Sequence, residues 1–343
     1  MKKKNLNCAV IGMGVGERHA NFYKNFTGTK LVKIYEKDIN KIKFLKKKYP
    51  NVEFVFKEDE IFKDRNIDTV SIASYDNYHA RQILKCIKTN KNIFVEKPLC
   101  LNLKELRLIR NRLMKSNINI SSNLILRGLS KFKTIENIVK KKQLGKIYYM
   151  EADYNYGRLY KIKEGWRSSM KFYSVTSGGG IHMIDQMVWL LKEYPYEVEA
   201  EGNKIITKDS RFKYNDFTLA ILKFKSGILA KISSNFGCKI PHHHVLNIYG
   251  SRGTIINNLN GVFFYKSEKK TIKPLKLKYK KTKVEKNNLI KNFSIKSLNK
   301  KSRIKNLITK KEILNSMLIS LAIDESIKKN KKIKINYNTF KLL

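Results

Sequence analysis

Hydrophobic and polar positions follow one repeating pattern through the first third of the chain. Short runs of apolar, often β-branched residues, as in buried parallel strands, alternate with stretches whose apolar residues recur every three or four positions, as in amphipathic helices. The expected strands are residues 8–11, 31–35, 52–56, 69–73 and 93–95, and the expected helices are residues 17–25, 39–48, 78–89 and 103–116. This alternation predicts an α/β domain built on a doubly wound parallel sheet.

The pattern changes after about residue 120, where strand-like runs dominate. The expected strands are residues 147–154, 218–224, 228–233 and 245–249, with turns at 225–227 and 250–253. Such hairpins predict a second α/β domain with a large, mainly antiparallel open sheet. An apolar helix at 181–191 follows three consecutive glycines, and a helix at 313–328 precedes a last strand at 332–335. Residues 266–311, rich in Lys and Asn, are expected to form loops and solvated helices.

Length and composition support two domains. The chain has 343 residues, more than one ordinary core organises, and 42% of them are apolar. We therefore expect one domain over residues 1–120 and a second over 121–343. No apolar run is long enough to cross a bilayer and none near the start resembles a signal peptide, so we expect a cytoplasmic protein with no membrane contact. The four cysteines lie far apart, without zinc or disulfide spacing, and no metal site is expected.

The charge of the chain raises the alternative of a nucleic-acid-binding protein. There are 72 Lys and Arg residues against 28 Asp and Glu, a formal net charge of +44. The positive residues, mostly Lys, are spread along the whole chain, and no helix-turn-helix, zinc-finger or single-strand-binding motif accompanies them. We therefore expect no specific nucleic-acid partner, but a solvated basic surface that attracts anionic metabolites.

A glycine-rich loop joins the first expected strand to the first expected helix. Its residues are Gly12, Met13, Gly14, Val15 and Gly16. Glycines let the backbone approach phosphates without a Cβ in the way, and the N–H groups of a helix N-terminus suit a pyrophosphate. Glu36 ends the second expected strand, where an acid accepts the ribose hydroxyl protons of NAD. Loop and acid together predict a dinucleotide site; a tight turn and a surface glutamate are the alternative.

Two details bear on the choice of dinucleotide. The third glycine comes one residue earlier than in the usual G-x-G-x-x-G spacing, and Glu17 stands in its place. Lys37, directly after Glu36, could accept the 2′-phosphate of NADP, whereas the carboxylate of Glu36 should repel it. NAD is therefore the expected cofactor, with NADP as the alternative.

Three further segments carry a family resemblance. Residues 74–79 (Ser-Tyr-Asp-Asn-Tyr-His) follow an expected strand, and Glu96-Lys97-Pro98 follows the next one. Residues 180–185 (Gly-Ile-His-Met-Ile-Asp) begin the apolar helix of the second half. Together with the glycine-rich start, this combination resembles the Gfo/Idh/MocA family over nearly the whole chain. The resemblance implies a Rossmann domain, followed by an α/β domain whose open sheet often mediates homodimers or homotetramers.

The same resemblance implies an NAD(P)-dependent dehydrogenase or reductase that acts on CH-OH groups of sugars, sugar nucleotides or cyclitols. It also suggests a role in polysaccharide biosynthesis. Matched residue by residue, Lys97 is the active-site lysine and His182 the catalytic histidine, and both contact substrate. The other matches are Ser74, Asn77, His79, Glu96 and Lys97 on the cofactor side, Trp166 and Arg167 near the cofactor or substrate, and Asn123 and Asp185 near the substrate.

These residue types fit the chemistry of alcohol oxidation. The substrate oxygen must lose a proton while its carbon loses hydride. A histidine, with an ordinary pKa of about 6.5, can take that proton near neutral pH. A lysine beside the hydroxyl stabilises the developing negative charge on oxygen. Lys97 and His182 are therefore the expected pair for the hydroxyl proton.

One position departs from the family pattern. Many relatives carry an aspartate four residues before the histidine, and here that position is Gly178. Either Lys97 and His182 suffice, or catalysis is altered. Two alternatives to a dehydrogenase therefore stay open: a redox-neutral glycosidase that holds NAD tightly, and a non-catalytic regulator that senses dinucleotide and sugar.

For several residues, a structural role is an alternative to the functional interpretation. His242, His243 and His244 resemble a metal cluster, but adjacent residues of a strand alternate between faces and cannot all reach one ion. Trp166 and Arg167 could be a packing tryptophan and a solvated arginine. Asp185 could contact substrate, or orient His182 and cap local backbone.

Overall fold

The computed structural model describes residues 5–269, 271–280, 282, 284–299, 302 and 308–343. The chain divides into two compact units, each made of two segments. Unit 1 contains Met1–Leu124 and Lys286–Leu314, and unit 2 contains Ile125–Glu285 and Asn315–Leu343. Residues Lys286–Leu314 thus pack with the N-terminal unit, whereas the sequence-based division placed everything after residue 120 in the second domain.

Unit 1 is built on a six-stranded parallel sheet of order β3-β2-β1-β4-β5-β6. The strands are β1 (Leu6–Ile11), β2 (Thr29–Tyr35), β3 (Glu53–Val55), β4 (Thr69–Ile72), β5 (Asn92–Val95) and β6 (Ile120–Ser122). The chain moves outward from β1 in one direction and then returns to β4 on its other side. The carboxyl ends of β1 and β4 therefore form the topological switch point, where ligands of doubly wound sheets bind. The predicted parallel sheet is confirmed.

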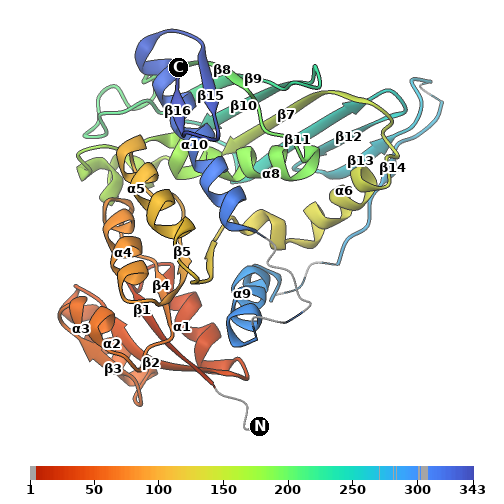
Figure 1. The fold of residues 1–343 in the computed structure, drawn as a ribbon. Helices are drawn as coiled ribbons and strands as arrows, with labels where there is room; N and C mark the ends of the chain where they lie inside the picture. The colour runs from red at the N-terminus through yellow and green to blue at the C-terminus, as the bar shows by residue number, and fades with distance from the viewer. Residues whose placement is uncertain (1–4, 270, 281, 283, 300–301, 303–307) are drawn as a thin grey trace. The chain divides into compact units, whose positions relative to one another are not determined.

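Helices cover both faces of this sheet. They are α1 (Gly16–Asn25), α2 (Ile39–Lys48), α3 (Asp59–Lys63), α4 (Asp76–Lys88), α5 (Leu103–Met114) and α9 (Asn288–Leu298). Figure 1 shows α4 and α5 on one side of the strands and α1 and α9 on the other. The Phe94 ring of β5 packs against both α1 and α9. Its centroid lies 5.0 Å from the His19 ring of α1 and 5.5 Å from the Phe293 ring of α9.

Unit 2 contains a ten-stranded sheet of order β14-β13-β12-β11-β7-β10-β9-β8-β15-β16. Its strands are β7 (Ile147–Asn155), β8 (Glu197–Asn203), β9 (Phe217–Lys223), β10 (Leu229–Asn235), β11 (His243–Gly250), β12 (Gly253–Asn258), β13 (Gly261–Tyr265), β14 (Leu275–Lys276), β15 (Ile333–Asn336) and β16 (Lys341–Leu342). The β7–β10 pair is parallel, while the neighbours on either side pair antiparallel. The predicted large and mainly antiparallel sheet is confirmed.

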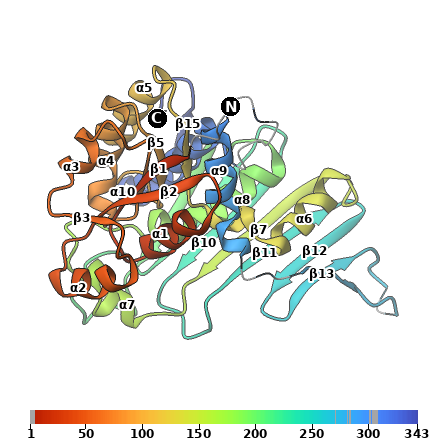
Figure 2. The same cartoon turned by 90° about the horizontal axis from the view of Figure 1, so that it is seen from below.

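The helices of unit 2 gather on one face of its sheet. The longer ones are α6 (Ser130–Lys140), α8 (Ile181–Leu191) and α10 (Lys310–Lys329), whose residues before Asn315 belong to unit 1, and α7 (Tyr160–Lys163) is a single turn. Figures 1 and 2 both show α6 and α8 on the same side of the strands. Residues 181–190 of α8 are all buried. A helix that is apolar almost all round is expected to be covered on every side.

The segment expected to be solvated is partly core. Helix α9 lies within residues 266–311 and buries Leu289, Ile290 and Phe293. Its weak periodicity hid this because charged and apolar residues are mixed around the helix. Residues 270, 281, 283, 300–301 and 303–307 of the same expected segment lie outside the described residues. Within the described part of the chain, no helix is both long and apolar enough to cross a membrane.

Candidate active site

The glycine-rich loop connects β1 to α1 at the switch point of unit 1. Gly12 has a φ of +85°, and a Cβ there would lie 2.6 Å from the carbonyl oxygen of Ala73. A Cβ on Gly16 would lie 3.0 Å from side-chain carbons of both Ala73 and Val10. Gly16 therefore allows helix α1 to pack tightly against the sheet, which is the task of the third glycine in the usual spacing. The early position of this glycine does not remove its structural role.

Gly14 differs from its two neighbours. A Cβ on Gly14 would meet no protein atom within 4 Å. The adjoining side chain of Val15 is half exposed. Nothing in the packing of the protein requires a glycine here, so the open space beside it fits a ligand that approaches the backbone closely. Because this space is open, the loop can accommodate a dinucleotide phosphate.

Glu36 closes the other side of this loop. Its Oε2 accepts a hydrogen bond from the Met13 amide at 2.8 Å, and its Oε1 accepts from the Lys37 amide at 2.7 Å. Burial acts to raise the pKa of Glu36, but the amide donors and the Lys41 ammonium outweigh it and hold the pKa below its usual value. Glu36 is therefore an anion at neutral pH and fits two ribose hydroxyls better than a 2′-phosphate.

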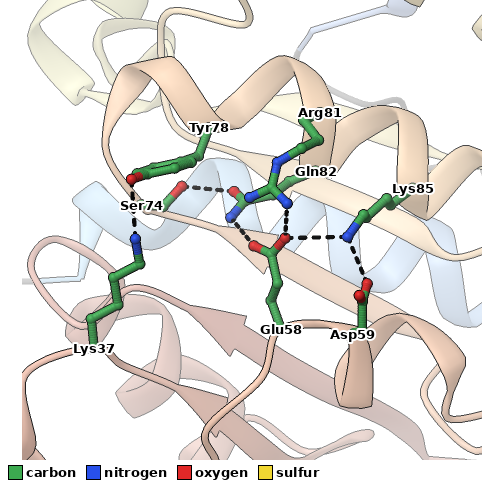
Figure 3. A network of polar contacts seen from close by, with 8 residues as sticks. All are labelled: Lys37, Glu58, Asp59, Ser74, Tyr78, Arg81, Gln82 and Lys85. Carbon is green, nitrogen blue, oxygen red and sulfur yellow. Dashed lines mark hydrogen bonds and ion pairs between the residues drawn. The ribbon is translucent and has the colours of Figure 1, made fainter.

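A polar network lies between the end of β2, α3 and α4 (Figure 3). The Lys37 ammonium lies 3.1 Å from the Tyr78 hydroxyl and 4.2 Å from the centre of that ring. Ser74 donates to Gln82 at 2.7 Å, and Gln82 donates to Glu58 at 2.8 Å. Lys37 is thus paired with an aromatic hydroxyl, and Ser74 is held by helix α4.

His79 joins the chain after β4 to the chain after β5. Its Nδ1 lies 2.6 Å from the Pro98 carbonyl oxygen and its Nε2 lies 3.0 Å from that of Ser74. The ring is fully buried. A doubly protonated ring would satisfy both carbonyls, whereas a neutral ring would satisfy one. Asn77 lies two residues before it, in the first turn of α4.

Glu96 is the centre of a buried polar group at the ends of β5 and β6. Its Oε1 accepts a hydrogen bond from Asn123 at 2.6 Å and lies 3.3 Å from Nε2 of His19. Burial acts to raise the pKa of Glu96, but His19, Asn123 and Lys97 together hold it below its usual value. Lys97 follows at the carboxyl end of β5 and is half-buried, with a cis peptide bond to Pro98.

In unit 2, His182 lies near the start of α8 and is 6% exposed. The Tyr154 ring of β7 stacks on it with a centroid separation of 6.0 Å, and the His244 ring of β11 lies 6.5 Å away. One turn further along α8, both carboxylate oxygens of Asp185 accept from Arg127, at 2.8 and 2.7 Å. Both side chains of this pair are only 1% exposed. This buried ion pair connects α8 to the 3₁₀ turn Ile125–Gly128.

Trp166 and Arg167 form a 3₁₀ turn before the glycine run. The guanidinium carbon of Arg167 lies 4.5 Å from the centre of the Trp166 ring, and Nε donates to the Tyr173 hydroxyl at 2.9 Å. The same guanidinium lies 5.8 Å from the centre of the Tyr156 ring. Arg167 is thus held by aromatic rings rather than extended into solvent.

The histidine run divides between the faces of its strand. The ring centroids of His242 and His244 lie 4.9 Å apart. On its own side of the strand, Nε2 of His243 lies 3.2 Å from Nδ2 of Asn155. Burial, with positive neighbours, lowers the pKa of His244 to about 3. Among the described residues, no three Asp, Glu, Cys or His side chains gather as metal ligands would.

The predicted site residues thus fall into two sets, each within one unit. Unit 1 holds the loop residues 12–16, Glu36, Lys37, Ser74, Asn77, His79, Glu96, Lys97 and Asn123, and unit 2 holds Trp166, Arg167, His182 and Asp185. The sequence analysis missed His19, Tyr154 and Tyr173, and it considered His244 only as part of a histidine run that resembles a metal cluster. His19 had a local signal, because it follows Gly16 by three positions and so lies on the same face of α1. The other three are brought in by packing between distant segments.

Comparison with known proteins decides the family. A family model described as "Oxidoreductase family, NAD-binding Rossmann fold" matches residues 6–122, and the model of the "GFO/IDH/MocA C-terminal domain" matches residues 132–256. The chain belongs to the Gfo/Idh/MocA family. This confirms the oxidoreductase class, the NAD-binding domain and the resemblance on which the residue matches rest.

Relatives of this Gfo/Idh/MocA chain are distant in sequence and close in fold. Myo-inositol 2-dehydrogenase of Thermotoga maritima is 24% identical over 257 residues, covering 73% of this chain and 74% of the relative. The 2,7-anhydro-N-acetylneuraminate hydratase of Escherichia coli is 23% identical over 261 residues, covering 73% and 67%. The solved structure of levoglucosan dehydrogenase in complex with NADH superposes with a TM-score of 0.84 at 17% identity, covering 97% of this chain and all of that one.

Proposed function

We propose that the protein moves hydride between NAD and a secondary hydroxyl or keto group of a sugar, sugar nucleotide or cyclitol. The observation that carries the proposal is Glu36, an ionised carboxylate tied to the backbone of an open glycine loop. The names of the relatives, an inositol dehydrogenase and a levoglucosan dehydrogenase, support a polyhydroxylated substrate. The negative charge of the Glu36 carboxylate also favours NAD as the cofactor, with NADP as the alternative.

Lys97 and His182 are the groups we assign to the hydroxyl proton. The nicotinamide ring, when bound, supplies the hydride acceptor or donor. His182 takes the proton of the substrate hydroxyl, and the Lys97 ammonium stabilises the negative charge that develops on oxygen. Support comes from the family match of both residues and from their settings: Lys97 follows the carboxyl end of the parallel strand β5, and His182 is buried among aromatic rings.

The remaining predicted residues have supporting roles in this proposal. In unit 1, Glu96 and Asn123 form one hydrogen-bonded pair, so Asn123 would orient the carboxylate beside Lys97. His79 would hold the two backbone segments at Ser74 and Pro98 that border the cofactor. In unit 2, Asp185 would act on substrate through its effect on α8, because Arg127 occupies both carboxylate oxygens. Trp166 and Arg167 would lie near the cofactor or substrate.

The first experiment is a titration of the purified protein with NADH and NADPH, followed by the emission of the reduced nicotinamide. A Gly14→Asp variant is the matched control, because its carboxylate would enter the open space beside the loop without touching protein atoms. We expect tighter binding of NADH than of NADPH, and loss of both in the variant. Binding that is unchanged in the variant would contradict this nucleotide site.

The second experiment separates net redox turnover from its alternative. The hydratase among the relatives shows that family membership alone does not fix the net reaction. With inositols, sugars and sugar nucleotides in turn, we expect one NADH formed for each ketone formed. Hydrolysis of a glycoside without NADH accumulation would select the redox-neutral glycosidase. Tight nucleotide binding with no turnover of any substrate would select the regulator, provided that a Lys97→Ala variant binds the nucleotide as tightly as the wild type.

Three further expectations remain proposals at this point. They are a homodimer or homotetramer, a cytoplasmic location and a role in polysaccharide precursor synthesis. The first is tested by sedimentation equilibrium of the full chain, in which a monomer would contradict it.

A further inference from the structure

Basic side chains gather between the end of β2 and helix α4, beside the carboxylate of Glu36 (Figure 3). They are Lys37, Arg81 and Lys85, and Lys41 of α2 lies 3.4 Å from Oε2 of Glu36 itself. The chain carries a formal net charge of +44, so its overall field favours NADP, whose 2′-phosphate adds negative charge to that of NAD. A preference for NAD therefore depends on how the cations near Glu36 are occupied.

The two cations of α4 contact carboxylates at the start of α3. Arg81 forms an ion pair with Oε1 of Glu58. Lys85 lies 3.3 Å from the same oxygen and 2.6 Å from Oδ1 of Asp59. The guanidinium carbon of Arg81 also lies 5.6 Å from the centre of the Tyr78 ring, so this ion pair packs beside the phenol. An incoming phosphate would have to compete with a carboxylate for either of these cations.

Lys37 has a neutral partner instead. Its Nζ donates to the Tyr78 hydroxyl at 3.1 Å and lies 4.2 Å from the centre of that ring. Figure 3 shows its side chain extending from the end of β2 to the phenol on α4. The hydrogen bond with Tyr78 raises the pKa of Lys37, so this side chain is an ammonium near neutral pH. A full positive charge thus directly follows Glu36 in sequence, and a phenol holds it.

The phenol and a 2′-phosphate would compete for the Lys37 ammonium. A phosphate monoester carries between one and two negative charges near neutral pH and several acceptor oxygens, so it is a strong partner for a lysine. Lys37 must leave the Tyr78 ring and hydroxyl before it can contact such a group elsewhere. The affinity for NADP is therefore lowered by up to the free energy of the Lys37–Tyr78 contact, whereas NAD has no phosphate that could recruit Lys37 in this way.

We propose that Tyr78 is a specificity-determining residue of the dinucleotide site, because it holds the Lys37 ammonium and so weakens the binding of NADP relative to NAD. Glu36 repels the 2′-phosphate, and Tyr78 withholds the neighbouring positive charge that would offset this repulsion. Both effects act against NADP in a strongly basic chain. The inference rests on the proposed nucleotide site and deepens it, since it names a second group that sets the choice of cofactor.

A pair of double variants tests this competition by titration with NADH and NADPH. Tyr78→Ala should lower the ratio of the NADPH to the NADH dissociation constant by up to about fivefold, the value of one exposed cation–π contact with its hydrogen bond. Adding Lys37→Ala should abolish this gain. Adding Lys43→Ala instead, at an exposed lysine of α2, is the matched control and should preserve it. An unchanged ratio in Tyr78→Ala, or a gain that survives Lys37→Ala, would overturn the proposal.

A milder variant and a salt series give independent readouts. Tyr78→Phe keeps the ring and loses only the hydroxyl, so it should shift the ratio in the same direction by about twofold even if the alanine variant does not fold. The gain in either variant should shrink as NaCl is added, because the new contact of Lys37 with phosphate is ionic and therefore screened. An unchanged ratio in Tyr78→Phe, or a gain that is independent of salt, would also overturn the proposal.

The same titrations separate this inference from the proposed function. If the wild type binds neither dinucleotide, the nucleotide site fails and the inference fails with it. If both dinucleotides bind and their ratio is equal in the wild type and all variants, the nucleotide site stands and only the role of Tyr78 is overturned.

Discussion

Two glycine-rich segments each precede a helix in this protein, and they serve opposite purposes. In the loop before α1, a Cβ on Gly14 would meet nothing within 4 Å. In the turn before α8, Cβ atoms on Gly178, Gly179 and Gly180 would collide with Tyr173, Tyr154 and Ser234. The first segment leaves room for something outside the protein, and the second is filled by the protein itself. Glycine before a helix is therefore evidence for a ligand only where the space stays open.

The largest expected effect concerns the helix that follows the filled segment. Arg127→Leu would leave the Asp185 carboxylate buried without its bidentate partner. Breaking such a pair costs about 3–5 kcal/mol of unfolding free energy. Urea denaturation followed by circular dichroism measures it, and Arg127→Leu with Asp185→Leu is the control that should recover part of the loss. A loss below about 1 kcal/mol in the single variant would show that the pair does not anchor α8.

The next prediction tests the filled segment directly. Gly179→Ala would force its new methyl group against the ring of Tyr154, which is 6% exposed and has neighbours on several sides. Overpacking of this kind costs about 1–3 kcal/mol. The same denaturation measurement checks it. If the variant were as stable as the wild type, the turn would be less tightly packed than its geometry indicates.

The matched change in the open segment should behave the other way. Gly14→Ala adds the same methyl group where no protein atom lies nearby, so the unfolding free energy should change by about 0.5 kcal/mol or less. The dissociation constant for NADH should rise on the order of tenfold, because the backbone can no longer approach the phosphates as closely. A stable variant with unchanged NADH affinity would contradict the assignment of this space to the ligand.

The smallest expected effect is a pH dependence of the unfolding free energy, which comes from a carboxyl group beside the filled segment. Ser174 and Ser177 donate to the carboxylate of Asp324, at 2.7 and 3.4 Å, yet burial raises the pKa of this carboxyl to about 7. The folded state therefore holds the proton more tightly than the unfolded chain does. This stabilisation is complete at acidic pH, below the unfolded pKa, and is lost as the pH rises through 7.

From pH 6 to pH 8 the loss should amount to about 1 kcal/mol. Asp324→Asn should remove this part of the pH dependence in thermal unfolding curves. The control is the same scan on a variant of the exposed Asp209, Asp209→Asn. Parallel curves for Asp324→Asn and the wild type would contradict the raised pKa.

Local patterns in the sequence were enough for the framework of the fold. Helix α8 has the predicted bounds, 181–191, because its apolar residues are continuous and the glycines mark its start. Strands β1, β2, β4 and β5 lie within a few residues of their expected positions for the same reason. The hairpin of β12 and β13 was not expected, because Asn257 and Asn258 interrupt its apolar alternation.

The candidate site was less accessible to sequence reasoning. Glu36 and the glycine loop could be predicted because spacing within one β-α-β unit fixes both. The partner of Gly178 could not, because a glycine carries no information about which side chain fills its space. Tyr173 is five residues away in sequence, but it reaches the glycine only through the turn Thr176–Gly180, whose π-helical form has no simple sequence signature.

Helix α9 has a consequence for the order in which the protein can fold during synthesis. It covers Phe94 in the sheet of unit 1 but is encoded after nearly the whole of unit 2. At ribosomal speeds, roughly 10 to 30 s separate the last strand of that sheet from α9. The aromatic face of the nascent nucleotide-binding unit therefore stays uncovered until α9 has been synthesised. A gene fragment that ended near residue 120 would encode the sheet without helix α9.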